Sequence, residues 1–466
     1  MDVRLIPEKC LWDEVSPATV STFGISERSN EKVIDSFDVV IIGAGFTGLW
    51  TAYYLHLNDP SLHIAIVEKN SVGYGASGRN GGWCSTIMPM SLDSIARQHG
   101  KDQAVNMQNA MFGTLKEIKS QIEGLDIACD FALGGSVEIL RSPIQVQRSQ
   151  KHVDNLRSYG FDDNYYQLLN PIDASEIVNA QGVCGALLDK QSAVLHPKKL
   201  CLGLARAVED QGTQIFENLE VLSYSNGEVL TSRHILKARC VLRTTEAFSV
   251  KFEESKRSVI PLYSMMIATE PLTAHVWERI GLKDRTTFND GRNMIIYGQR
   301  TADDRIAFGG RGAPYHFGST IKPDFDFNQN VAKRLHRTLV EMFPILINVE
   351  ITHHWGGPLA APRDWTFSIH FNPETGLGSA GGYVGDGVAS SNLAGRTLAD
   401  LVCGHSSDLT RLPSVNHQSR KWEPEPLRFT AVNALTQLAM LADWQEAKTG
   451  RPAKAISALI EKLTSG

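Results

Sequence analysis

The stretch from Phe37 to Leu55 constrains the fold of this chain more than any other. It reads FDVVIIGAGFTGLWTAYYL, with a short apolar run, a glycine-rich turn and a helical segment. The apolar, β-branched run is typical of a parallel strand that is covered on both faces. Gly43, Gly45 and Gly48 have the spacing G-x-G-x-x-G. This spacing allows a tight turn, a close approach of phosphate to the backbone, and close packing of the helix on the strand.

The residues that follow place this motif in the context of a dinucleotide site. Residues 63–67 read HIAIV and lead into Glu68. An acid about 20 residues beyond the glycines accepts hydrogen bonds from the adenosine ribose hydroxyls, and the helix N-terminus attracts phosphate. The alternatives are an α/β core without nucleotide and a membrane span over 39–57. Three glycines, two threonines and His56 argue against the span.

A glycine-rich loop follows Glu68. Residues 71–83 read SVGYGASGRNGGW. A backbone with so few side chains can lie closely around a flat ligand. Ser77, Arg79 and Asn80 add donors for phosphate or ring oxygens. A flexible surface loop is the alternative, but the dinucleotide motif just upstream favours the ligand-binding interpretation.

The turn, Glu68 and the sequence GASGRNGG at 75–82 together resemble the FAD-dependent D-amino-acid oxidase superfamily, and within it the γ-glutamylputrescine oxidase-like branch. The resemblance implies that FAD is the cofactor and that the glycine-rich loop at 71–83 runs along the FAD diphosphate to the isoalloxazine ring. Trp83 departs from this branch, in which we expect a smaller polar residue. That departure concerns the substrate more than the cofactor.

Three later segments extend the resemblance. Residues 354–358, HWGGP, are similar to the W-G-G turn that the family places beneath the flavin. Residues 381–388 read GGYVGDGV and precede a predicted helix that reaches about Cys403. In the family such a loop abuts the pyrimidine edge of the flavin. There, backbone N–H groups and the helix dipole favour the negative charge of the reduced ring. Residues 238–246 resemble the family's ATNAY segment, with Glu246 in place of asparagine, and the sequence offers no account of this change.

The resemblance carries over to individual residues. Arg305, Trp355 and Tyr383 are the candidate catalytic residues. Residues 294–297 and 305–308 are predicted to form a hairpin, in which Arg305 resembles a cation that relatives place beneath flavin N5; an exposed strand arginine is the alternative. Tyr383 is expected at the flavin edge, with plain packing as its alternative. Val221 is the candidate for a backbone contact to adenine. The residues expected to bind FAD are Gly43, Ala44, Gly45, Phe46, Thr47, Gly48, Glu68, Lys69, Gly75, Ala76, Ser77, Gly78, Arg79, Asn80, Gly81, Gly82, Val221, Gly357, Gly382, Tyr383, Val384, Gly385, Gly387 and Val388.

The family's chemistry implies a hydride transfer from the carbon beside an amine to flavin N5, followed by imine hydrolysis and reoxidation by oxygen or another acceptor. Amino-acid oxidases of the superfamily place an arginine just beyond the W-G-G turn. Here Pro358-Leu-Ala-Ala361 follows, which favours a polyamine or γ-glutamylamine. Arg311 or Arg363 would hold a carboxylate if the substrate is instead an N-methyl or secondary amino acid, such as a sarcosine-like compound. A flavin-binding protein without turnover is the third possibility.

The chain has 466 residues, enough for more than one domain. We expect an α/β fold: a discontinuous Rossmann-like FAD-binding domain of the glutathione-reductase type, an interleaved sheet-rich α+β substrate domain, and a helical C-terminal extension. The predicted boundaries are a lead-in at 1–36 that Trp12 anchors, an FAD-binding domain from 37–90, 193–250 and 350–405, a substrate domain from 91–192 and 251–349, and an extension at 406–466 with helices at 427–447 and 453–463.

The composition of the chain limits the partners, the compartment and the metal sites that can be expected. The net charge is −5 without a long basic run, so neither nucleic acid nor a membrane surface is expected as a partner. Seven scattered cysteines without a C-x-x-C pair, and no signal-peptide pattern, favour a reduced, cytoplasmic protein. His353 and His354 lack a third ligand at a recognisable spacing, so no metal is expected. The oligomeric state stays open.

Overall fold

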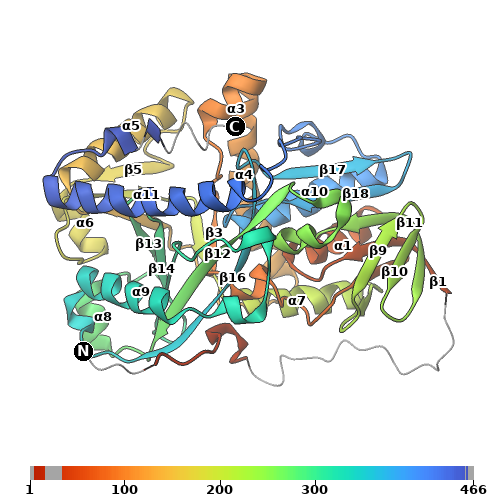
Figure 1. The fold of residues 1–466 in the computed structure, drawn as a ribbon, viewed down its shortest axis with the longest axis horizontal. Helices are drawn as coiled ribbons and strands as arrows, with labels where there is room; N and C mark the ends of the chain where they lie inside the picture. The colour runs from red at the N-terminus through yellow and green to blue at the C-terminus, as the bar shows by residue number, and fades with distance from the viewer. Residues whose placement is uncertain (1–4, 16–33, 457, 460–466) are drawn as a thin grey trace.

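The structure is a computed structural model that describes residues 5–15, 34–456 and 458–459. Two large sheets lie side by side in it (Figure 1). The first has the strand order β17-β18-β11-β1-β2-β8, with β9 and β10 attached beside β11. Its strands are β1 (Ile34–Ile42), β2 (Ile64–Val67), β8 (Gln214–Phe216), β9 (Val221–Ser225), β10 (Glu228–Thr231), β11 (Ile235–Arg243), β17 (Ser368–Asn372) and β18 (Leu377–Gly381).

The first sheet confirms the discontinuous Rossmann-like fold. β1 pairs in parallel with β2 on one side and with β11 on the other, although β11 follows almost two hundred residues later. Helices α1 (Phe46–Asn58), α7 (Pro197–Asp210) and α10 (Gly387–Cys403) accompany this sheet. β1 begins at Ile34, three residues before the predicted start. Parallel strands covered in this way are buried on both faces, as the residues Val39 to Ile42 are.

The second sheet has the order β16-β12-β15-β14-β13-β4-β6-β5. Its strands are β4 (Ser136–Leu140), β5 (Tyr166–Leu169), β6 (Gly185–Asp189), β12 (Val259–Thr269), β13 (Thr287–Asp290), β14 (Ile296–Arg300), β15 (Ile306–Gly310) and β16 (Ile351–Pro362). β14 and β15 form the predicted hairpin. A two-stranded sheet of β3 (Trp83–Ser85) and β7 (Ser192–Val194) is separate from both.

One prediction for this region is wrong. Residues 354–358 do not form a W-G-G turn, because they lie inside the twelve-residue strand β16, which pairs with β12 along most of its length. β16 therefore belongs to the second sheet, although its residues fall in the range 350–405 that was predicted for the FAD-binding domain. Two consecutive glycines suggested a turn, but pairing with the long strand β12 determines the local conformation.

The other helices lie beside both sheets. Helices α3 (Leu92–His99) and α4 (Lys101–Gly124) pack against each other, and α4 packs against α10. Helices α5 (Pro143–Ser158), α6 (Pro171–Ile177), α8 (Ala274–Ile280) and α9 (Gln329–Met342) come from the segments that hold the second sheet. None of the helices in the described ranges combines the length and apolar character that crossing a membrane requires.

The two ends of the chain are tied to the body. Trp12 is 2% exposed, and its indole N–H donates to the carbonyl of Asn80 at 2.7 Å, which confirms it as the anchor of the lead-in. At the other end, helix α11 (Leu427–Thr449) crosses the outside of the second sheet (Figure 1). There, the backbone N–H groups of Asn293 and Met294 donate to the carboxylate of Asp443 at 2.6 and 2.8 Å. Of the second predicted helix, 453–463, residues 454–456 and 458–459 are helical, and residues 457 and 460–463 lie outside the described residues.

Close packing of α1 against α10 generates a prediction about stability. A Cβ on Gly395 of α10 would lie 2.7 Å from Cβ of Trp50 and 2.9 Å from the backbone N of Thr51. Gly395→Ala should therefore lower the free energy of unfolding by about 1–3 kcal/mol, because backbone and packed core must move. Urea unfolding measures it.

The matched control is Gly113→Ala in α4, where an added Cβ meets nothing within 4 Å. This change should raise stability by up to about 1 kcal/mol, since alanine favours the helix. A Gly395→Ala protein as stable as the unmodified chain would contradict the tight crossing.

Candidate active site

A cavity of about 430 Å³ lies where distant parts of the chain meet. Its walls come from the loop between β1 and α1, from residues that follow β2, from the segment after β11, and from the start of α10. A further wall is formed by Ile321, Lys322, Pro323 and Asp326. The cavity thus lies at the carboxyl ends of the parallel strands β1, β2 and β11, where open α/β sheets bind their ligands.

The first glycine loop has the geometry of a phosphate site. Gly43 has a φ of +108°, which few other residues adopt, and Gly45 caps α1. A Cβ on Gly48 would lie 2.1 Å from the carbonyl oxygen of Gly43, so this position requires glycine. Thr244, just after β11, supports the loop by donating from its hydroxyl to the carbonyl of Ile42 at 3.0 Å.

Glu68 and Ser77 are fixed beside this loop. The Glu68 carboxylate accepts the N–H of Ala44 at 3.0 Å and that of Asn70 at 2.8 Å, and burial raises its pKa. The Ser77 hydroxyl accepts the N–H of Phe46 at 2.9 Å. Both side chains line the cavity. A fixed carboxylate at the end of the second strand is the arrangement that binds the adenosine ribose.

The second glycine loop that leads into a helix is formed by residues 381–387, between β18 and α10. It is called the second glycine loop below, and the turn before α1 is called the first. Glycines 381, 382 and 385 have positive φ values of 156°, 89° and 113°, and Val384 has one of 55°. The loop turns sharply enough for Tyr383, Gly385, Gly387 and Val388 to line the cavity. The Tyr383 hydroxyl lies 2.9 Å from the hydroxyl of Thr47 in the first turn of α1, so this loop is joined directly to the helix that follows the first glycine loop.

The structure shows what Glu246 contacts, which the sequence alone left unexplained. One carboxylate oxygen accepts the N–H of Tyr383 at 3.0 Å, and the other accepts the N–H of Ala360 at 3.2 Å. The carboxylate therefore ties the end of β11 to the second glycine loop and to β16, and it lines the cavity. Burial raises the pKa of Glu246 to about 7.

Trp355 is 1% exposed and lies behind the glycine-rich loop at 71–83. Its indole N–H donates to the carbonyl of Arg79 at 2.9 Å, and its ring packs edge-on against Trp12 at 6.0 Å. It is not one of the residues that line the cavity. Arg79 itself pairs with Asp326, which joins the glycine-rich loop to the wall at 321–326. Trp355 thus positions the loop.

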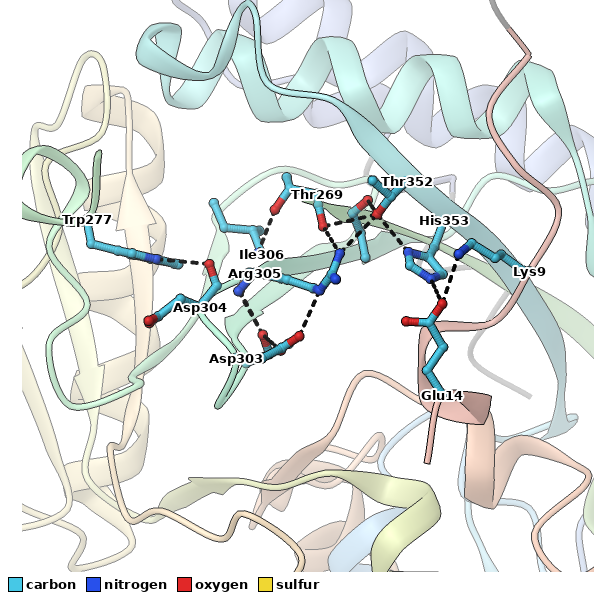
Figure 2. Close-up of polar contacts among 12 residues, drawn as sticks. Lys9, Glu14, Thr269, Trp277, Asp303, Asp304, Arg305, Ile306, Thr352 and His353 are labelled. Atoms are coloured by element: carbon cyan, nitrogen blue, oxygen red, sulfur yellow. Dashed lines mark hydrogen bonds and ion pairs between the residues drawn. The ribbon is translucent and has the colours of Figure 1, made fainter. Parts of the chain in front are cut away.

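The side chain of Arg305 is held by other protein groups (Figure 2), whereas the resemblance implied a position beneath flavin N5. Its guanidinium donates to Asp303 at 2.8 Å, to the carbonyl of Thr269 at 3.0 Å and to the hydroxyl of Thr352 at 3.2 Å. It does not line the cavity. These contacts favour a structural role, in which Arg305 joins the hairpin turn to β12 and β16.

The neighbouring histidines bind the lead-in. The His353 ring lies 2.9 Å from the carboxylate of Glu14 (Figure 2), and the His354 ring lies 3.0 Å from the carbonyl of Pro7. Within the described ranges, no group of three or more His, Cys, Asp or Glu side chains is placed to hold a metal ion.

The cavity brings together most of the predicted FAD-binding residues. Those that line it are Gly43, Gly45, Phe46, Thr47, Glu68, Lys69, Gly75, Ala76, Ser77, Asn80, Val221, Tyr383, Gly385, Gly387 and Val388. Those that do not are Ala44, Gly48, Gly78, Arg79, Gly81, Gly82, Gly357, Gly382 and Val384. For both sets, contact with the cofactor stays a prediction, and several residues of the second set support the lining residues from behind.

Several parts of the wall were missed, among them residues 244–248 and 321–326. Residues 244–248 follow a buried parallel strand, so their place at the cavity was predictable from the topology of such sheets. The stretch 321–326 carries no recognisable motif, because it reaches the cavity only through the course of the chain after β15.

Two glycine loops, each leading into a helix and both facing one cavity, define a dinucleotide-binding enzyme fold. The family model described as DAO, FAD dependent oxidoreductase, matches residues 38–401. The chain therefore belongs to this family of FAD-dependent oxidoreductases.

Individual relatives agree with this assignment. The chain is 29% identical over 401 residues to the probable oxidoreductase OrdL of Haemophilus influenzae, covering 82% of this chain and 88% of the relative. It is 28% identical over 408 residues to the gamma-glutamylputrescine oxidoreductase of Escherichia coli, covering 86% and 91%. The crystal structure of glycine oxidase from Geobacillus kaustophilus has the same fold, with a TM-score of 0.69 at 20% identity, covering 82% of this chain and 99% of that one.

The phosphate site generates a second prediction. Gly45 has φ −86° and ψ −178°, which valine adopts without strain, but a Cβ there would lie 2.9 Å from the Ser77 hydroxyl and narrow the approach to α1. Gly45→Val should give soluble protein that binds FAD at least about 100-fold more weakly and is colourless after purification. Visible absorption measures it.

Gly113→Val, on the exposed side of α4, is the control and should keep the yellow colour. A Gly45→Val protein with the full flavin spectrum would place the diphosphate elsewhere.

Proposed function

We propose that this oxidoreductase oxidises the C–N bond of a small amine, with a polyamine or γ-glutamylamine as substrate and oxygen as the acceptor that yields peroxide. FAD, when bound, accepts a hydride from the carbon beside the amine nitrogen, and the imine then hydrolyses in water. The chain's own part is to hold the amine over the flavin and to control charge near the ring.

The observation that carries the substrate class is the charge of the cavity wall. No arginine is found on this wall within the described ranges. The Arg311 guanidinium donates to the carbonyl of Val384 at 2.6 Å and lies over the Trp365 ring. Arg363 pairs with Glu423 at 3.1 Å and lies over Trp422. Neither arginine is therefore placed on the wall as a clamp for a substrate carboxylate.

Four acidic side chains line the cavity beside three lysines: Glu68, Glu220, Glu246 and Asp326, with Lys69, Lys251 and Lys322. Asp326 and Glu246 both face it, and Asp326 is 6% exposed and paired with Arg79. A partly compensated acidic wall suits a substrate with a second cationic group, as a polyamine has. The similarity to a gamma-glutamylputrescine oxidoreductase over most of both chains supports the same class.

An N-methyl or secondary amino acid is the second candidate. Lys322 lines the cavity and is a cation that a carboxylate can approach. The Arg311 guanidinium also lies next to the second glycine loop, so a substrate carboxylate would have to compete with the carbonyl of Val384 for it. This competition favours the amine over the amino acid.

A substrate panel tests the proposal. Steady-state turnover of diamines, γ-glutamylamines and N-methyl amino acids should be measured with oxygen and with an artificial acceptor. We expect kcat/KM for the best amine to exceed that for sarcosine by about 10- to 100-fold, because a clamp to a charged group is worth about 1.5–3 kcal/mol and is missing here.

Turnover confined to N-methyl amino acids would reject the amine in favour of the second candidate. Anaerobic mixing separates both from a protein without turnover: a flavin that no compound of the panel bleaches would show that this protein only binds FAD.

A further inference from the structure

Glu246 is an acidic side chain at the edge of the cavity where the family resemblance places the flavin pyrimidine ring. It follows β11 with a φ of +46°, a left-handed conformation that is uncommon for a residue other than glycine. Such conformations persist where the surrounding structure holds them, and they gather at functional sites. Here the N–H groups of Tyr383 and Ala360 hold the carboxylate from two different segments.

The charges around Glu246 do not form an ion pair with it. From its own segment, Arg243 and Lys251 are the cations, and the guanidinium of Arg243 donates to the hydroxyls of Tyr224 and Ser249. From the second glycine loop, Asp386 adds a further buried carboxyl group, and Arg311 lies beside Asp386. The residues of β16 at this place, Pro358, Leu359 and Ala360, carry no charge. From α1, the Thr47 hydroxyl pairs with Tyr383.

The two backbone N–H groups stabilise the ionised form, whereas burial opposes it. Burial is the larger influence and raises the pKa of Glu246 to about 7. Near pH 7 the carboxyl group is therefore balanced between its protonated and ionised forms, so a change of charge nearby alters its protonation. Reduction of a bound flavin is such a change, because it adds negative charge at the N1–C2=O edge.

We propose that Glu246 binds one proton when the bound FAD is reduced and releases it when the FAD is reoxidised. The proton comes from solvent and forms an O–H bond on a carboxylate oxygen, while the hydride that reduces the flavin comes from the reductant. The gain of one negative charge on the flavin is thus matched by the loss of one on Glu246. The inference depends on FAD binding at the second glycine loop and not on which amine is oxidised.

The test measures the flavin midpoint potential of the holoenzyme electrochemically, from pH 6 to pH 9, in the unmodified chain and in Glu246→Gln. In the unmodified chain the slope of potential against pH should steepen above about pH 7, to roughly two protons per two electrons. In Glu246→Gln it should stay near roughly one proton per two electrons. The two potentials should converge near pH 6, where Glu246 is protonated in both redox states, and Glu246→Gln should have the higher potential at pH 9.

Asp189→Asn is the matched control. Asp189 ends β6 in the second sheet, burial raises its pKa to about 7, and it does not line the cavity. Its variant should reproduce the unmodified slope. A merely structural role of Glu246 would change FAD affinity or thermal stability in the variant without removing a proton from the slope.

Two outcomes would overturn the proposal. One is an unmodified enzyme that takes up roughly one proton per two electrons over the whole range, a result that does not require the variant to fold. The other is a Glu246→Gln enzyme with the unmodified slope, which would move the proton to another group, such as Asp386 or the flavin itself. Because the electrode replaces the substrate, failure to oxidise any amine would leave this measurement intact.

Discussion

The hydrogen bond between the hydroxyls of Thr47 and Tyr383, at 2.9 Å, joins the two parts of the chain on which the site depends. These residues lie 336 positions apart: Thr47 lies in the first turn of α1, directly after the first glycine loop, and Tyr383 lies in the glycine loop before α10. The helices α1 and α10 pack closely at Gly395, so the two N-termini are held toward one cavity. A dinucleotide needs its diphosphate and its ring system bound at a fixed separation, and this rigid crossing supplies that separation.

The second sheet contributes support more than direct contact. Trp355 on β16 holds the carbonyl of Arg79, and Trp12 of the lead-in packs against Trp355 and binds Asn80. The described part of the lead-in, 5–15, and β16 therefore support the glycine-rich loop from behind, and part of that loop lines the cavity. Glu246 links β16 to the second loop through Ala360 and Tyr383. The site is thus a place where both sheets are fastened together, and its polar groups are fixed before any ligand arrives.

Local patterns predicted part of this structure, and pairing between distant strands determined the rest. The sequence from Phe37 to Glu68 folds as expected because strand, turn and helix signals agree within thirty residues. Residues 354–358 were misjudged because β12, almost ninety residues earlier, holds them in a strand. Arg305 was predicted at the flavin because its hairpin was recognised, but the partners of its side chain, Thr269 and Thr352, come from strands whose register the sequence does not reveal. The wall at 321–326 lacked any motif, and the role of Glu246 required the positions of two N–H groups from other segments.

Hydrogen–deuterium exchange of the apoprotein, with and without FAD, tests the central claim that both loops bind the same molecule. The account predicts that FAD slows exchange in peptides covering 43–49 and in peptides covering 382–389, with the same dependence on FAD concentration. The peptide covering α11, which lies outside the second sheet away from the cavity lining, should not respond. Slower exchange at 43–49 alone, with 382–389 unchanged at saturating FAD, would contradict the account and leave a nucleotide site without its flavin half.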